Sequence, residues 1–179
     1  MEAVILIGIQ ATGKSTFYKQ NFFKSHMRIN LDMLKTRAKE DILVNACIKA
    51  KQPFVIDNTN SSIDERKKYI EISKEAGFSI IGYYFESNIK DAIVRNQSRI
   101  GKENIPSKGI EHTYNKLVIP TYDEGFDKLF HVSIGKDDSF VIEEWENFYR
   151  LNQLFLNLHG ITHTQPRYSP YCHSLLELS

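Results

Sequence analysis

A glycine-rich stretch directly after an apolar run carries the clearest chemical signal in the sequence. Residues 3–7 (AVILI) lead into residues 8–16 (GIQATGKST), which match the pattern G-x-x-x-x-G-K-[ST] in full. In such a loop, backbone N–H groups and the positive end of the following helix bind phosphate. Phosphate contacts are expected from Gly8, Gln10, Ala11, Thr12, Gly13, Lys14, Ser15 and Thr16. Lys14 would reach the β- and γ-phosphates and the Ser15 hydroxyl would bind Mg²⁺, so the stretch predicts nucleotide binding.

A second polar stretch, residues 28–37 (RINLDMLKTR), places Asp32 just after an expected strand. Open α/β sheets bind ligands at the carboxyl ends of their strands. A carboxylate there can accept the proton of an attacking hydroxyl and orient it toward a γ-phosphate. Asp also caps helix N-termini well, and the two roles can coexist. Lys35 and Arg37 follow within two turns, where they would hold an anionic acceptor.

A third carboxylate follows the short apolar run 53–56 (PFVI). Asp57 at this position has the rigid support that a Walker B carboxylate needs to reach Mg²⁺ or its water shell. The alternative is that Asp57 and Asn58 are only turn residues, which their types also favour.

Two arginines, Arg95 and Arg99, lie four residues apart near the end of an expected helix and would share one helix face. Residues 90–116 contain six Lys/Arg against three Asp/Glu. Arginines on a lid over a phosphate site neutralise charge that develops in phosphoryl transfer. The alternative is a solvated basic helix face.

The elements that would position these residues alternate between strand and helix. Expected strands cover residues 4–7, 27–31, 54–56, 79–85 and 130–134, and expected helices cover 14–24, 34–51, 64–76, 89–99 and 142–158. Ser62 and Gly77 provide start and stop signals for the third helix, and residues 102–109 are expected to form a loop. The alternation predicts an α/β P-loop NTPase fold, with a parallel β-sheet of about five strands flanked by helices and a helical lid.

Length and composition are those of one soluble globular domain. The chain has 179 residues, 41% hydrophobic and 25% charged, with a net charge of +1, so no global field indicates nucleic acid or a membrane. The two cysteines, Cys47 and Cys172, lack metal spacing and suit a reducing cytosol, and residues 1–3 lead straight into a strand, so a cytoplasmic protein without a signal peptide is expected. We expect a kinase domain at 1–159 and a C-terminal tail, or the start of an incomplete second domain, at 160–179.

Taken together, these motifs resemble the polynucleotide 5′-hydroxyl kinases. The resemblance is strongest to the kinase domain of bacteriophage and animal polynucleotide kinase-phosphatases, and it spans roughly residues 1–135. The residues that carry it are 8–16, Asn30-x-Asp32, 56–60 (IDNTN), Arg95-Asn96-x-x-Arg99, Tyr114 and 119–126 (IPTYDEGF). It implies that ATP and Mg²⁺ are bound by Lys14 and Ser15 and that Asp32 is the general base for the 5′-hydroxyl of a DNA or RNA end. It also implies that Asp57 lies beside the metal and the acceptor, and that Arg99, assisted by Arg95, holds the donor phosphates.

The chain also departs from that family. Some members have an arginine three places after the general base, where this chain has Lys35, a charge without the bidentate fork; Arg37 is the candidate substitute. No D-x-D-x-T phosphatase motif is present, so the resemblance supports kinase activity only. Two other functions remain open: a kinase for a small metabolite, nucleoside or sugar nucleotide, and a switch module that hydrolyses NTP slowly.

Overall fold

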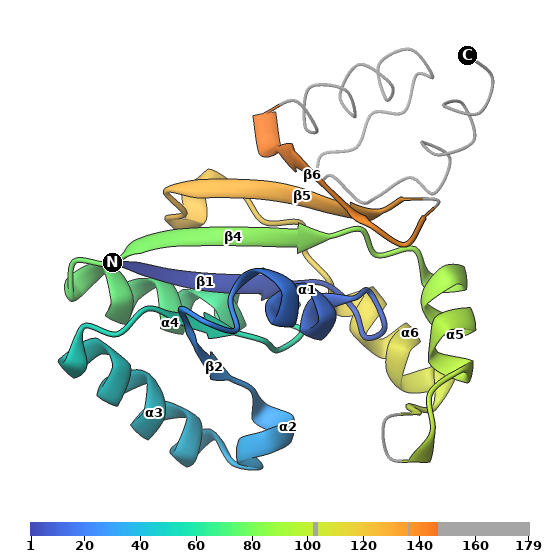
Figure 1. Ribbon diagram of the computed structural model, residues 1–179, viewed down its shortest axis with the longest axis horizontal. Helices are drawn as coiled ribbons and strands as arrows, with labels where there is room; N and C mark the ends of the chain where they lie inside the picture. Colours follow the sequence, from blue (N-terminus) through green and yellow to red (C-terminus); the bar gives the residue numbers. More distant parts are fainter. Residues whose placement is uncertain (102–103, 136, 147–179) are drawn as a thin grey trace.

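A six-stranded sheet forms the centre of the molecule in the computed structural model, which describes residues 1–101, 104–135 and 137–146 (Figure 1). The strand order is β2-β3-β1-β4-β5-β6. Strands β1 to β5 are parallel, and β6 pairs antiparallel with β5. The strands are β1 Glu2–Ile7, β2 Met27–Ile29, β3 Phe54–Ile56, β4 Ser79–Phe85, β5 Lys128–Ile134 and β6 Phe140–Glu144.

Helices cover both faces of this sheet. They are α1 Lys14–Asn21, α2 Leu31–Leu34, α3 Arg37–Ala50, α4 Ile63–Glu75, α5 Ile89–Gln97 and α6 Ser107–Lys116, with a 3₁₀ turn at Tyr122–Glu124. Helix α1 lies on one face and α3 and α4 on the other, while α5 and α6 lie side by side beyond the carboxyl end of β4 (Figure 1). None of the helices in the described ranges is long and apolar enough to cross a membrane.

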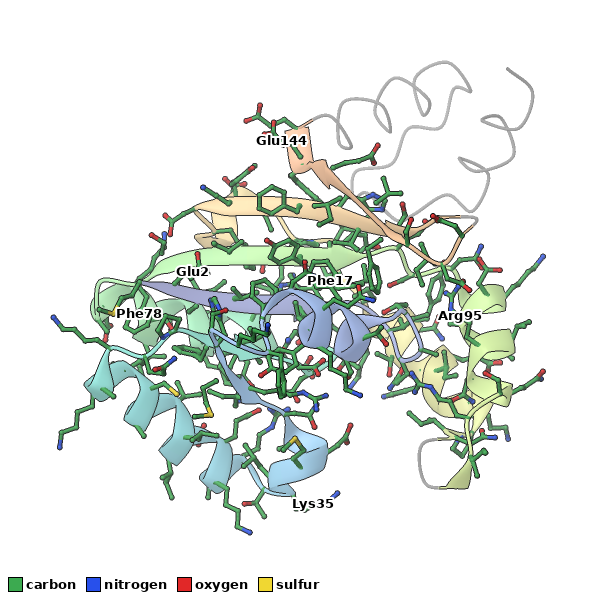
Figure 2. All side chains as sticks on the ribbon, viewed as in Figure 1. Glu2, Phe17, Lys35, Phe78, Arg95 and Glu144 are labelled. Carbon is green, nitrogen blue, oxygen red and sulfur yellow. The ribbon has the colours of Figure 1, made fainter. Side chains whose placement is uncertain are left out.

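The sequence of β1 explains why both faces are covered. Because side chains alternate along a strand, Val4 and Leu6 pack toward α1, whereas Ile5 and Ile7 pack toward α3 and α4. Phe17 of α1 fills the first of these layers (Figure 2), with Phe85 and Phe140 in edge-to-face contact around it. The unbroken apolar run before the glycine-rich loop is therefore a strand buried on both sides.

The expected α/β fold is confirmed, and most elements begin and end within a few residues of their expected limits. Helix α4 starts as expected, since Ser62 and Glu65 form a reciprocal capping box. The chain leaves α4 through Gly77, whose φ of 78° suits a residue without Cβ.

The expected helix at 142–158 is wrong at its beginning. Residues up to Glu144 belong to β6, which doubles back on β5 and adds a sixth, antiparallel strand. Residues 140–144 pair with β5 over their whole length, and Phe140 packs on the α1 face of the sheet. Residues 147–158 and the expected tail at 160–179 lie outside the described residues.

Two further boundaries differ from expectation. The strand expected to reach residue 31 ends at Ile29, where Asn30 caps the short helix α2. The helix expected at 34–51 begins only at Arg37, because Thr36 caps α3 with its side chain. The loop expected at 102–109 ends earlier, since Pro106 is followed directly by helix α6. Pro is well tolerated just before a helix, and that position was the available signal.

Candidate active site

The glycine-rich loop has the backbone geometry of an anion-binding loop. Gly13 precedes α1 with a φ of 88°, and no side chain caps the helix, so the first N–H groups of α1 face outward. A Cβ at Gly13 would stand 2.9 Å from the Phe140 ring, so the position requires glycine for space as well as for φ. Gly8 donates its N–H to the Thr59 carbonyl at 3.0 Å, which ties the loop to the segment after β3.

Lys14 is folded back over its own loop. Its ammonium donates to the carbonyls of Gly8 at 2.9 Å and Ile9 at 2.5 Å, and it lies 3.3 Å from the Thr12 hydroxyl. Burial lowers the pKa of Lys14 to about 8, against the opposing attraction of Asp57. A buried cation whose partners are neutral oxygens of its own loop is well suited to bind phosphate oxygens.

Ser15 and Asp57 are in direct contact. The Ser15 hydroxyl donates to Asp57 Oδ2 at 2.9 Å, and the Asp57 side chain is only 2% exposed at the end of β3. Hydroxyl and carboxylate oxygens are ligands that Mg²⁺ prefers, usually with phosphate and water completing the shell. These two side chains therefore fit a magnesium ion next to bound phosphates.

Arg28 is the residue at this site that the sequence analysis missed. From β2 it donates to Asp57 Oδ2 through Nε at 2.8 Å and Nη2 at 2.5 Å, and to the Ser15 hydroxyl at 3.0 Å. The alternation of side chains along β2 could have identified Arg28 from the sequence. Ile29 is buried in the core, so Arg28 points to the opposite face of the strand. Its guanidinium compensates the buried Asp57 charge.

Asp32 lies on α2, and its helix is fixed by two asparagines. Asn30 accepts from the Met33 N–H at 3.1 Å and donates to the Asp57 carbonyl, while Asn58 accepts from the Leu31 N–H at 2.8 Å. The alternative reading of Asp32 as an N-cap is wrong, because Asn30 fills that role. Asp32 is thus exposed and does not cap the helix. The helix that carries it is joined to residues 57 and 58 by the two asparagines.

One cavity of about 100 Å³ brings the expected groups together. It is lined by loop residues 10–15, by Asp32 and Asp57, and by Arg99. Helix α5 ends at Gln97, so the expected continuous helix through Arg99 is wrong, and Arg99 reaches the cavity from the segment after the helix.

The two lid helices contact the loop rather than stand apart from it. Arg95 donates to the Ala11 carbonyl at 2.8 Å (Figure 2), and Gln10 donates to the Thr113 hydroxyl of α6 at 2.9 Å. Arg95 therefore braces the loop backbone, whereas Arg99 lines the cavity. Thr113 was not expected from the sequence, because only the missed helix α6 brings it to the loop.

Lys35 and Arg37 do not line this cavity. Lys35 is exposed at the end of α2 with a φ of 69° (Figure 2). Arg37 donates to Glu40 at 2.7 Å and to the Tyr69 hydroxyl at 3.1 Å. The expected acceptor contact of Arg37 is thus replaced, in this structure, by a contact with a buried carboxylate.

Glu40 is the centre of that second cluster. The Glu40 side chain is fully buried, and its carboxylate also accepts hydrogen bonds from Lys68 at 2.9 Å and Asn58 at 2.7 Å. Burial would raise the pKa of Glu40, but hydrogen bonds from Arg37, Lys68, Tyr69 and Asn58 outweigh it and lower the pKa. Because Asn58 also holds the start of α2, Glu40 supports the helix that carries Asp32 without touching the cavity.

A strand, loop and helix with this geometry, at the carboxyl end of a central strand of a parallel sheet, define a P-loop nucleotide-binding protein. The family model described as an AAA domain matches residues 4–118, and the chain belongs to that family. The bifunctional polynucleotide phosphatase/kinase of Schizosaccharomyces pombe is 30% identical over 135 residues, covering 73% of this chain and 33% of that protein. This similarity confirms the resemblance to polynucleotide kinases, and the chain spans about a third of the length of the curated relatives it matches.

Solved structures agree on the fold. Kti12 of Chaetomium thermophilum in complex with ADP-AlF3 is 16% identical with a TM-score of 0.57, covering 90% of this chain and 99% of that one. A gluconokinase from Sinorhizobium meliloti is 17% identical with a TM-score of 0.53, and the match covers 90% of this chain and 98% of the gluconokinase chain. At such identities these neighbours establish the shared architecture alone.

Proposed function

We propose that the protein transfers the γ-phosphoryl group of ATP to the 5′-hydroxyl of a DNA or RNA end. The observation that carries the proposal is the shared cavity, in which an exposed carboxylate, Asp32, faces the phosphate-binding loop. A carboxylate at that position can accept the proton of an attacking hydroxyl and orient its oxygen toward the γ-phosphate. The name of the similar Schizosaccharomyces pombe protein supports a polynucleotide as the acceptor.

Each side chain has a distinct part in this reaction. Lys14 and the N–H groups of α1 bind the β- and γ-phosphates, and Ser15 and Asp57 would hold Mg²⁺, which neutralises phosphate charge when bound. Asp32 accepts the proton of the 5′-hydroxyl as its oxygen attacks phosphorus in line with the leaving ADP oxygen. Arg99 stabilises the charge on the transferring group.

The test is label transfer from γ-labelled ATP, in the presence of Mg²⁺, to DNA and RNA oligonucleotides with a 5′-hydroxyl. We expect label on at least one oligonucleotide with the wild type, and transfer lower by about a hundredfold or more with Lys14→Ala or Asp32→Asn. Asp41→Asn, an exposed carboxylate on α3, is the matched control and should leave transfer unchanged. Transfer to a panel of small metabolites and nucleosides, but to no oligonucleotide, would overturn the polynucleotide proposal.

A further inference from the structure

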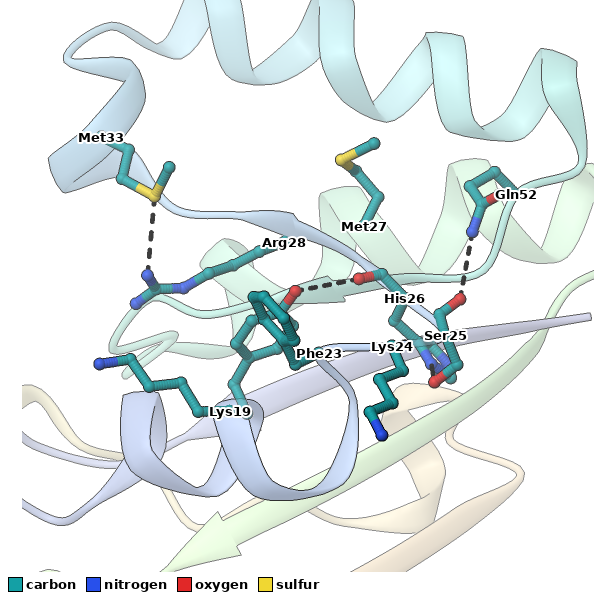
Figure 3. A pocket seen from close by; sticks show the side chains of 10 residues that line it. Lys19, Phe23, Lys24, Ser25, His26, Met27, Arg28, Met33 and Gln52 are labelled. Atoms are coloured by element: carbon teal, nitrogen blue, oxygen red, sulfur yellow. Dashed lines mark hydrogen bonds between the residues drawn. The ribbon is translucent and has the colours of Figure 1, made fainter.

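A groove of about 520 Å³ lies beside the candidate site (Figure 3). It is formed by the second half of α1, the loop that follows, β2 and the outer side of α2. At one end of this groove, Arg28 contacts Met33 and also holds Asp57 and Ser15. Met33 is the neighbour of Asp32 on α2, so the groove begins where the candidate site ends.

The lining of the groove is cationic. Lys19, Lys24 and Arg28 belong to it, whereas no Asp or Glu is among its ten lining residues. The side chains of Lys19 and Lys24 flank it in Figure 3 and are exposed. In a chain with a net charge of +1, this is a local concentration of positive charge that favours a polyanion.

The same groove exposes large apolar side chains. Phe23 is 69% exposed, Met33 63% and Met27 45%, although Phe22, the neighbour of Phe23, is buried in the core. The Phe23 ring is therefore not needed for packing, and it lies between the two lysines along the chain. An exposed aromatic ring with lysines on either side is the arrangement by which proteins bind single-stranded nucleic acid, through base stacking and phosphate contacts.

We infer that this groove binds the single-stranded part of the acceptor that follows the 5′-terminal nucleotide. Phe23 stacks on a base, Lys19 and Lys24 bind phosphates, and the terminal nucleotide lies at Asp32. The inference rests on the proposed function, which it extends by naming a path for the strand. Single-stranded nucleic acid is favoured over a protein partner because the lining supplies cations and a ring but no carboxylate.

The experiment uses Lys19→Glu/Lys24→Glu and Phe23→Ala, with Lys49→Glu/Lys128→Glu and Ile42→Ala as controls at exposed positions outside the groove. Anisotropy of a labelled twelve-nucleotide single strand gives Kd, and phosphoryl transfer gives KM for that strand and for a dinucleotide. We expect the double lysine variant to raise Kd and KM for the long strand by about tenfold and to reduce the salt slope of log K by about 1.4. Phe23→Ala should also weaken binding, with the dinucleotide kinetics unchanged in both.

The outcomes separate the two proposals. Transfer with normal Kd and KM for the long strand in the groove variants would overturn the groove assignment and leave the proposed function intact. Absence of transfer to every oligonucleotide by the wild type would instead overturn the proposed function itself. Sedimentation of all variants adds one check: loss of a dimer in the groove variants alone, with strand binding unchanged, would assign the groove to a second copy of the chain and overturn the inference.

Discussion

The glycine-rich loop and helix α2 face the same cavity, but different kinds of contact hold them in place. The loop is one continuous stretch with many contacts of its own, since Gly13 is in a left-handed conformation and Lys14 bonds loop carbonyls, and Arg95 braces it from α5. Helix α2 has only four residues and is held by its N-cap Asn30, which also bonds the Asp57 carbonyl, and by Asn58 from the segment after β3. The donor side is thus a local structure, whereas the acceptor side is assembled from distant residues.

This difference has a functional meaning. A phosphate group is the same in every nucleotide, so a fixed backbone cradle serves it. An acceptor varies between enzymes, and a short helix held by a few replaceable side chains can change its position or its residues without disturbing the loop. We therefore expect substitutions on the donor side to act on the chemistry directly and those around α2 to act also through position and stability.

The largest expected effect is that of Lys14→Met. Removing the cation should lower the rate of phosphoryl transfer by on the order of a thousandfold, because the charge stabilises the transferring group in a site shielded from water. The free energy of unfolding should not fall, since methionine removes a buried charge and has a side chain of similar length and shape to lysine. Initial rates at saturating ATP and thermal unfolding measure the two effects, with Lys49→Met as the exposed control. A rate within tenfold of the wild type would contradict the donor role.

Asp32→Asn should come second. A general base contributes about a hundredfold or more, so kcat should fall by that factor while the KM for ATP stays near the wild-type value. Because Asp32 is exposed and caps no helix, the variant should unfold at the wild-type temperature. An unchanged kcat would place the base elsewhere, and a large loss of stability would show that Asp32 supports α2 instead.

The effect of Glu40→Gln should be smaller and should depend on pH. The pKa of Glu40 is lowered in the folded state, so its contribution is complete well above the ordinary value of 4.5 and is lost as the pH falls through the folded value. At pH 7 we expect the variant to lose about 2 kcal/mol in free energy of unfolding, as for hydrogen bonds to a charged group, and the difference to shrink as the pH falls below 4.5.

Denaturant unfolding across pH measures this difference, and Glu71→Gln, whose carboxylate forms an exposed pair with Lys67, is the control. Glu40→Gln should also raise the KM for the acceptor, because Asn58 links Glu40 to the start of α2. A stability loss that is independent of pH would show that packing, rather than the charge of Glu40, is what matters.

The contrast between the two sides also explains what the sequence could predict. The loop and the positions of Asp32 and Asp57 after their strands are patterns of neighbouring residues, and strands β3 and β4 begin and end where expected. Arg28 and Asn30 act through contacts with residue 57, which depend on how β2 and β3 lie side by side. Helix α6 was missed because its sequence is mostly polar, with only Ile110 and Thr113 buried, and because Pro106 and Gly109 are residues typical of loops.

The smallest expected effect is that of Ser62→Ala, and it tests whether local stability and acceptor geometry are separable. The substitution removes the capping bond to the Glu65 N–H and should cost about 1 kcal/mol of unfolding free energy. Its rate of transfer should stay at the wild-type value, because the contacts of Lys68 and Tyr69 with the Glu40 cluster do not involve the Ser62 cap. Calorimetry and initial rates measure both quantities, with Ser107→Ala, at the first residue of α6, as the control. If Ser62→Ala slowed transfer as much as Glu40→Gln, the acceptor side would depend on general stability rather than on the particular contacts that hold α2.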